Sequence, residues 1–244
     1  MKRILTILAF TISLSICHAQ EAVYLVSNPN TARWSYIETD SHGKMTATIF
    51  NSVESIAGDA VNGNIKMLVE EVPVASPKDT VRSFVYYRFK DGEFMADMSA
   101  MMSADYFASY VEENYPELTE EQMNEVLQEL QAMYTSGEIR GIPRYPKTGK
   151  LPDFEFQFKL SIINMKVVGE ERKIVGTEKI QTGAGSFDCF ILEEKISTKF
   201  MLMKDVENIR SWYAYGIGLV KEVTYDKNGK MISTMILNEI TAKR

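Results

Sequence analysis

The chain contains few of the side chains that most catalytic and metal sites use, with two cysteines and two histidines in 244 residues. Cys17 and His18 fall within a predicted N-terminal leader, so only Cys189 and His42 remain beyond it. A lone cysteine excludes an internal disulfide and any zinc site built from several thiolates. His42 lies in SHGK, a predicted turn tip, where it is poorly placed to serve a Ser-His-Asp triad. We therefore predict no enzymatic activity, no catalytic residue, no metal site and no cofactor.

Long apolar runs are missing after the N-terminus. The first nineteen residues begin with Lys2 and Arg3, continue with an apolar stretch over 4–16 and end at Ala19. This layout predicts a secretory signal peptide over 1–19. No later window has the about eighteen uninterrupted apolar residues that a transmembrane helix needs, so no transmembrane segment is expected.

The leader determines the expected location of the protein. Residues 20–244 should form a soluble, exported chain that is periplasmic or secreted. Lipid anchoring through Cys17 is the less favoured alternative, because Ile16 occupies a position that normally holds Gly, Ala or Ser.

Basic residues are outnumbered. The chain has 27 lysines and arginines against 33 aspartates and glutamates, and loss of the leader changes the net charge from -6 to -8. Without a basic surface, nucleic-acid binding is not expected. Adjacent carboxylates such as Glu70 with Glu71 and Glu120 with Glu121 are ordinary in an acidic protein. Nothing singles out the two carboxyl groups that a glycosidase places across a cleft, so a hydrolase remains a minor alternative.

Turn-forming sequences and strand-like runs dominate the chain. SHGK at 41–44, VNGN at 61–64, KDGE at 90–93 and KNGK at 227–230 predict hairpins with type I′ turns. Runs of β-branched and aromatic residues predict strands over 33–40, 44–57, 64–74, 80–90, 93–98, 154–168, 171–181, 186–197, 208–215, 217–226 and 230–241. In 154–168 the apolar alternation changes face near Ile162, which predicts a bulge in one long, strongly curved strand.

The middle of the chain follows a helical period instead. Ser103 is a candidate N-cap, Pro116 interrupts the first segment, and Thr119 with Gln122 forms a capping box for a second segment that ends at Gly137. The second segment carries apolar residues at three- and four-residue spacing: Met123, Val126, Leu127, Leu130, Met133 and Tyr134. Three prolines in GIPRYPKTGKLPD, residues 141–153, are expected to forbid regular structure there.

These patterns together predict a mainly β (α+β) protein. A curved antiparallel sheet or half-barrel of about ten strands should form a single domain over 20–244. A helical insert at about 103–136 should pack on its concave side.

Gly216 and Gly218 in WYAYGIGLVKEV raise the question of a phosphate-binding loop. A dinucleotide fingerprint would need a third glycine, where this chain has Lys221, and a following helix, where it predicts a strand. The two glycines are therefore interpreted as a bend in a β-hairpin.

Together with GAGSFDCFILE and RYPKTGKLPD, this string resembles an exported bacterial domain-of-unknown-function family similar to the lipoprotein-carrier half-barrel. The resemblance covers most of 30–241. It implies a curved antiparallel sheet with helices against its concave face, and it carries over no functional residue.

The methionine run FMADMSAMM offers a chemical alternative. Met95, Met98 and Met101 recur at three-residue spacing, with Met102 beside them, and thioethers are soft ligands suited to Cu(I). The favoured interpretation is that these flexible side chains fill irregular core space. Cys189, in SFDCFIL, is likewise interpreted as a small core residue of a strand.

The abundance of aromatic residues on both faces of strands such as VRSFVYYRF, 81–89, favours a non-catalytic role. We expect an exported binding or carrier protein with an apolar groove for a small molecule or lipid. The alternative is a structural or interaction protein of the envelope, with a protein partner, whose concave face is filled by its own helices.

Overall fold

In the computed structural model the described residues are 32–58, 63–90, 93–101, 119–130, 134–143, 145–160 and 163–242. Within them, fourteen antiparallel strands form one sheet. The strands are β1 (Ala32–Asp40), β2 (Met45–Gly58), β3 (Gly63–Pro73), β4 (Val81–Lys90), β5 (Glu93–Ala96), β6 (Tyr134–Gly137), β7 (Ile139–Pro143), β8 (Gly149–Lys150), β9 (Phe154–Leu160), β10 (Ile163–Thr182), β11 (Gly185–Phe200), β12 (Met203–Ala214), β13 (Gly218–Asp226) and β14 (Met231–Ala242). The mainly β, antiparallel prediction is confirmed, and the count of about ten strands is too low.

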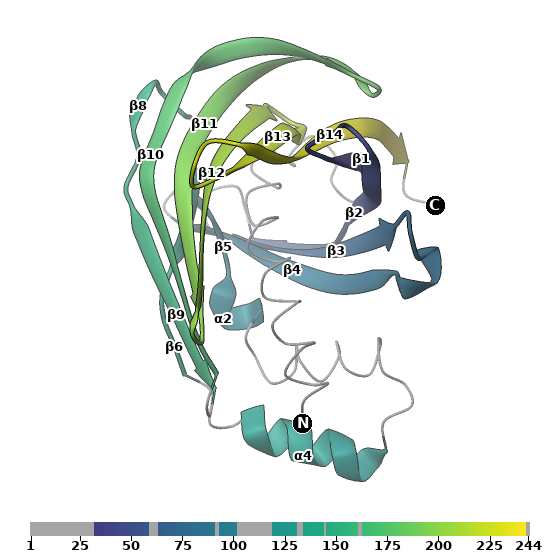
Figure 1. Cartoon of the computed structure of the whole chain (residues 1–244), viewed down its shortest axis with the longest axis vertical. Helices are drawn as coiled ribbons and strands as arrows, with labels where there is room; N and C mark the ends of the chain where they lie inside the picture. The colour runs from purple at the N-terminus through teal and green to yellow at the C-terminus, as the bar shows by residue number, and fades with distance from the viewer. Residues whose placement is uncertain are drawn as a thin grey trace.

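The sheet bends almost into a barrel, further than the half-barrel predicted (Figure 1). Its strand order is β6-β9-β10-β11-β12-β13-β14-β1-β2-β3-β4-β5-β7, and β8 pairs with β10 off this path. The two edge strands, β6 and β7, are consecutive in the chain and separated only by Glu138. The chain therefore crosses directly from one edge of the sheet to the other, and this crossing closes the curve covalently.

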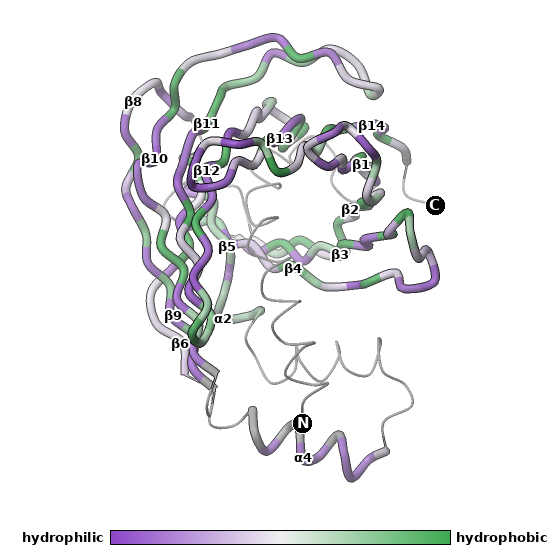
Figure 2. Tube along the Cα trace, in the orientation of Figure 1, coloured by the Kyte–Doolittle hydropathy of each residue, from purple (hydrophilic) through white to green (hydrophobic). Residues whose placement is uncertain are grey.

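Side chains alternate between the two faces of the sheet. In β4, Ser83, Val85 and Tyr87 are buried while Phe84 and Tyr86 are partly exposed. The buried set faces the inside of the curve, and its apolar members, Val85 and Tyr87, belong to the main core. Apolar and polar stretches alternate along the strands in Figure 2, as a sheet with one enclosed face requires.

The hairpins β1–β2 and β13–β14 use the same turn. Asp40 accepts backbone hydrogen bonds from His42 and Lys44 through its side chain, and Asp226 does the same for Asn228 and Lys230. In each turn only the glycine, Gly43 or Gly229, has positive φ among the loop residues. The predicted type I′ turn is therefore wrong here, because it needs two such residues; a three-residue turn ending in a glycine bulge fits instead. The turns expected at 61–64 and 90–93 include residues outside the described ranges.

The apolar slip near Ile162 marks a strand end and not a bulge. Leu160 pairs with Ile163, so the chain reverses there and β9 and β10 are separate strands. β10 then continues unbroken through the gap expected at 169–170. Its ladder is irregular between Glu170 and Lys173 and again between Ile174 and Gly176.

The helical insert predicted over 103–136 is largely wrong as described. Helix α4 (Glu120–Leu130) does begin at the predicted capping box, where Thr119 N–H donates to the side-chain oxygen of Gln122 and Gln122 N–H donates to the Thr119 hydroxyl. However, α4 lies at the lower end of the molecule rather than inside the curve (Figure 1), and residues 134–136 belong to β6. The first predicted helical segment, 103–116, lies outside the described residues. A single helical turn, α2 (Met98–Met101), follows β5.

The short strands β7 and β8 contradict the expectation that the prolines of 141–153 forbid regular structure, and β6 replaces the end of a predicted helix. Pro143 is the last residue of the edge strand β7, a position where the missing N–H is tolerated. A Cβ added to Gly137 or Gly141 would meet the carbonyl oxygen of Glu155 or Phe94 at 2.1 or 1.8 Å. These glycines permit the close backbone approach that the crossing between the edges requires.

Candidate functional site

The inner face of the curved sheet is a continuous apolar surface, and we take it as the candidate site. Strands from both halves of the chain contribute to one buried cluster. Members that are at most 2% exposed include Tyr36, Ile49, Val53, Met67, Val85, Tyr87, Phe94, Phe156, Phe158, Val167, Leu192, Tyr213, Leu219 and Leu237. Two aromatic pairs stack within it, Tyr87 with Phe94 and Phe190 with Tyr213, at ring-centroid distances of 4.9 and 5.6 Å. Both halves of the chain therefore contribute to one apolar interior.

Arg172 places a charge inside this apolar face. It lies in the irregular segment of β10, next to Glu171, whose φ is +55°. A bulge of this kind redirects a side chain, and here it turns the guanidinium inward, where it is 0% exposed. Arg172 Nε donates to Glu194 Oε2 on β11 at 3.0 Å, and both groups are buried.

The same guanidinium also binds backbone carbonyl groups of two other segments. It donates to Pro152 O at 2.8 Å, to Arg140 O at 3.0 Å and to Gly141 O at 2.7 Å. The last two acceptors lie on β7, the far edge of the sheet. Arg172 therefore joins β10 to β7 and completes the closure of the curve, a seam that we call the Arg172 seam. Nε, Nη1 and Nη2 all donate in this way, so the buried pair helps to hold the sheet closed.

Other polar atoms on the inner face differ in how well they are satisfied. Ser211 donates to Glu222 at 2.9 Å, and the Tyr36 hydroxyl donates to Leu219 O at 3.2 Å. Trp34 is only 4% exposed, yet its indole Nε1 has no hydrogen-bond partner among the described residues. Buried donors without partners are uncommon, and among the described residues of the inner face the Trp34 N–H is one such donor.

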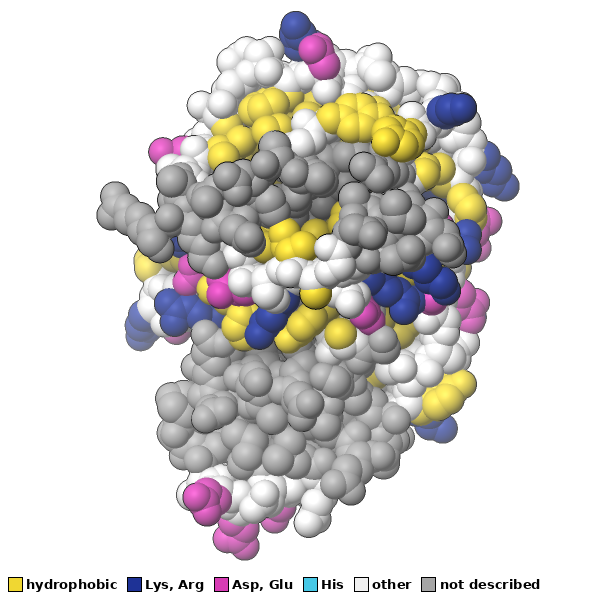
Figure 3. All heavy atoms as spheres, turned by 180° about the vertical axis from the view of Figure 1, so that it is seen from behind, with side chains coloured by type: hydrophobic (Ala, Val, Ile, Leu, Met, Phe, Trp, Pro, Cys, Tyr) yellow, Lys and Arg dark blue, Asp and Glu magenta, His cyan; other side chains and the backbone are white. Residues whose placement is uncertain are grey.

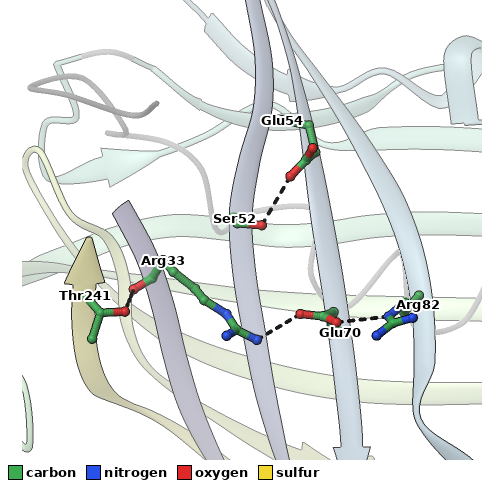
Figure 4. A network of polar contacts seen from close by, with 6 residues as sticks. All are labelled: Arg33, Ser52, Glu54, Glu70, Arg82 and Thr241. Atoms are coloured by element: carbon green, nitrogen blue, oxygen red, sulfur yellow. Dashed lines mark hydrogen bonds and ion pairs between the residues drawn. The ribbon is translucent and has the colours of Figure 1, made fainter. Parts of the chain in front are cut away.

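The outer face of β1–β4 carries a charged network instead (Figure 4). Glu70 accepts from Arg33 at 2.8 Å and from Arg82 at 3.0 Å, so it joins β1, β3 and β4. The Arg33 guanidinium crosses β2 over the ring of Phe50, 4.1 Å from its centroid. Figure 3, taken from behind, shows hydrophobic side chains beside basic and acidic ones on the surface. Glu71, the neighbour of Glu70, points to the other face by strand alternation, so this pair of carboxylates does not act together.

A polar hollow of about 240 Å³ lies over β10–β13. Its charged side chains pair across the strands: Lys173 with Glu193 at 3.2 Å, Lys195 with Glu171 at 3.2 Å, and Arg210 with Glu193 at 3.6 Å. These ion pairs are half-exposed, which is the ordinary condition of a charged outer sheet face.

The glycine pair lies where the hairpin interpretation predicts. Gly216 and Gly218 have φ of +73° and +93° in the turn between β12 and β13, and Ala214 pairs with Gly218. Ile217 N–H donates to Ala214 O at 3.2 Å. The turn leads into β13 and not into a helix, so the bend is confirmed.

Cys189 is a buried core residue, as predicted. It is 1% exposed and belongs to a second apolar cluster, on the face opposite Phe190, that also contains Trp212. Burial raises the pKa of the thiol to about 12, with smaller contributions from Asp188 and Glu178. A thiol with so high a pKa is protonated at neutral pH and is a poor nucleophile.

The remaining predicted candidates do not converge on a site. His42 is exposed at its turn, and Glu120 and Glu121 are exposed on α4. Met98 and Met101 join the inner core, whereas Met95, between the inward-facing Phe94 and Ala96, is buried on the opposite face. Met102 lies outside the described residues. The core interpretation of the methionines is therefore favoured over a shared copper site.

Two further features concern the part of the chain that the structure describes. Its helices include none that is long and apolar enough to cross a membrane. Its histidine, cysteine, aspartate and glutamate side chains form no group of three or more arranged to hold a metal ion.

Comparisons with known proteins agree with this fold. A protein from Parabacteroides distasonis assigned as a lipoprotein has a solved structure that matches 89% of this chain and 98% of its own, with 18% identity and a TM-score of 0.62. A protein from Bacteroides fragilis assigned as exported, with a YmcC-like fold, matches over 86% and 95% of the two chains, with 16% identity and a TM-score of 0.57. No curated protein matches. The sequence profile of the DUF3108-like family matches residues 30–237, and the chain belongs to this family.

Proposed function

We propose that this protein is an exported, non-catalytic binding or carrier protein that encloses an apolar small molecule or a lipid chain within its curved sheet. The observation that carries the proposal is the continuous inner apolar face, to which strands from both halves of the chain contribute. Flat aromatic and branched aliphatic surfaces recognise hydrocarbon chiefly through the area removed from water.

The Trp34 indole adds a specific feature to this surface. Its buried N–H has no partner among the described residues, so it can donate to an ester or carboxyl oxygen of a bound lipid. Lipid headgroups and fatty acids both supply such an acceptor. A single oriented donor in an apolar site is the usual means of fixing ligand orientation.

The other buried polar groups support a binding role rather than catalysis. The Arg172 guanidinium is held by Glu194 and three backbone carbonyls, and Glu222 accepts from Ser211. Cys189 is held protonated by its raised pKa. These groups are engaged in structure, which leaves the inner face to act through shape and apolar area.

Native mass spectrometry of protein purified from its own host tests the proposal. We expect a copurified apolar ligand, released by organic extraction, and saturable binding of the fluorescent probe N-phenyl-1-naphthylamine to the extracted protein. Absence of both would count against a carrier.

Trp34→Phe tests the role of the indole. It should weaken binding of a fatty acid by roughly two- to tenfold, the usual range for one hydrogen bond. The same variant should weaken binding of N-phenyl-1-naphthylamine less, since this probe has no acceptor oxygen for the indole N–H and loses only contact area with the larger ring. Equal loss for both ligands would indicate altered packing instead.

A second candidate is an envelope structural or interaction protein with a filled interior. The near-complete burial of Phe158, Val167 and Leu192, each 0% exposed, favours it. The two candidates differ in the mass measurement: a filled interior predicts protein free of ligand and no saturable probe binding.

Export itself belongs to the proposal. The predicted leader over 1–19 and the exported or lipoprotein assignment of the two solved structures support it. The mass of the mature N-terminus distinguishes cleavage after Ala19 from acylation at Cys17, and Cys17→Ser should leave release of the protein unchanged if the cleavage is the predicted one.

A further inference from the structure

The turn between β11 and β12 ends in an exposed apolar tip. Phe200 pairs with Met203, so Met201 and Leu202 are the central residues of the turn. Met201, Leu202 and Met203 are 40%, 98% and 68% exposed. Surface turns favour Gly, Asn, Asp, Pro and Ser, yet the sequence from 199 to 204 is KFMLMK. We call Phe200–Met203 the tip.

The backbone of the tip is also held in an unfavourable conformation. Met201 has a φ of +53°, which residues with long side chains rarely adopt. Its N–H donates to Asn164 O at 2.7 Å, which fastens the tip against the start of β10. The apolar side chains are therefore presented by a fixed turn and not by a loose loop.

Three lysines lie near the tip on the outer face of the sheet. Lys199 on β11 lies directly opposite Lys204 on β12, and like charges in this position destabilise a strand pair. Lys159 lies on β9, one strand beyond the Asn164 segment of β10. All three are exposed, and none forms an ion pair with another described residue. We call these three residues the lysine collar.

An exposed aromatic residue lies at the same end of the molecule. Tyr134, the first residue of β6, is 59% exposed and pairs with Lys159. The lower ends of β6, β9, β10, β11 and β12 come together in Figure 1. The tip, the collar and Tyr134 thus share one edge.

We propose that this edge docks on a lipid bilayer with anionic headgroups. The tip inserts into the interfacial region, where its apolar side chains leave water, while the collar lysines meet lipid phosphates and Tyr134 lies at headgroup level. Three unfavourable features meet in this turn: apolar exposure, a strained methionine and facing lysines. An anionic bilayer compensates both the apolar exposure and the repulsion between the facing lysines. A purely apolar partner would compensate only the apolar exposure.

The attraction must come from the collar, because the chain as a whole has a net charge of -6. Helix α4 also lies at the lower end and exposes Glu120, Glu121 and Glu125, which anionic lipid would repel. Docking of the edge requires no ligand in the interior of the sheet and is independent of the proposed carrier function.

Vesicle flotation tests the proposal with the purified protein. Phosphatidylcholine vesicles are compared with vesicles that also contain phosphatidylglycerol, and the bound fraction is measured as a partition coefficient. We expect binding that phosphatidylglycerol strengthens. Lys199→Gln with Lys204→Gln should reduce this binding by about fivefold for each lysine. Leu202→Asn with Met203→Thr should reduce it by about tenfold or more on both vesicles.

Two further measurements make the result specific to the tip. Ile232→Asn, a control at an apolar residue that is 42% exposed on β14, should bind as the parent chain does. Leu202→Trp should move its fluorescence to shorter wavelength when vesicles are added, as expected for insertion. Thermal melts establish that each variant is folded. Failure of the parent chain to bind either vesicle, or equal binding by the Leu202→Asn, Met203→Thr variant, would overturn the proposal, and an outcome of this kind would favour a protein partner.

Discussion

The Arg172 seam and the tip both reverse the usual distribution of polar and apolar groups, and they differ in what compensates the reversal. At the seam a charge is buried, but Glu194 and three carbonyl groups receive its hydrogen bonds. At the tip apolar side chains are exposed, and no described contact removes Leu202 from water, since it is 98% exposed. A reversal that is compensated within the chain indicates a structural role. A reversal that nothing within the chain compensates indicates a binding partner outside the chain.

The largest expected effect follows from removing one half of the seam. Arg172→Met should lower the free energy of unfolding by about 3–5 kcal/mol, because Glu194 would be left as a buried, uncompensated charge. Chemical denaturation measures this loss. Combining it with Glu194→Leu should recover a substantial part of the stability. If Arg172→Met alone were neutral, the seam would not be the closure that the geometry indicates.

A substitution at the tip should change the free energy of unfolding in the opposite direction. Met201→Gly removes the strain at positive φ and should raise the free energy of unfolding by about 1 kcal/mol. The measurement is again a denaturation curve in the absence of lipid. Glu171→Gly, at the other described non-glycine residue with positive φ, is the matched control for strain relief on a charged surface. A loss of stability in Met201→Gly would mean that the tip is supported by contacts within the chain.

Much of this comparison could have been read from the sequence, and part of it could not. The alternation in VRSFVYYRF and the turns at 41–44 and 227–230 predict antiparallel strands, because these signals are local. The string KFMLMK was itself visible, but its interpretation as a turn needed the pairing of Phe200 with Met203. An apolar run with no turn residue gives no sign that the chain reverses there.

The seam was beyond sequence reasoning for a different reason. Arg172 stands in EERK, which is indistinguishable from a solvated charged stretch. Its burial depends on a bulge and on carbonyl groups contributed by residues more than twenty positions away, in a segment rich in Gly and Pro. Closure through Glu138 likewise depends on two strands of four and five residues, which are too short to give a periodic signal.

Glu207 is a partly buried carboxyl group, so it is intermediate between the buried charge of the seam and the exposed side chains of the tip. It lies on β12 near the tip, and burial raises the pKa of its carboxyl, with a smaller contribution from Asp205. Because the folded pKa is raised, the folded state binds more protons, and stability falls as pH rises from the ordinary glutamate value through the folded value. Glu207→Gln should therefore be more stable than the parent at neutral pH and no more stable below the ordinary value. Asp205→Asn should reproduce a smaller part of this gain, and thermal melts across this pH range measure both.

The two aspartate turns should show the smallest effect, with the opposite dependence on pH. Backbone N–H groups of His42 and Lys44 lower the pKa of Asp40, and those of Lys230 and Asn228 lower that of Asp226. The stabilisation is therefore present above the ordinary aspartate pKa and is lost as pH falls through the lower folded value. Asp226→Ala should be less stable than the parent at neutral pH, by an amount that shrinks in acid. Both turns are exposed, so the difference should be small, and melts with both aspartates replaced increase it. If the double variant lost nothing at neutral pH, turn chemistry would contribute little to these hairpins, and the departure from it at the tip would no longer argue for a partner.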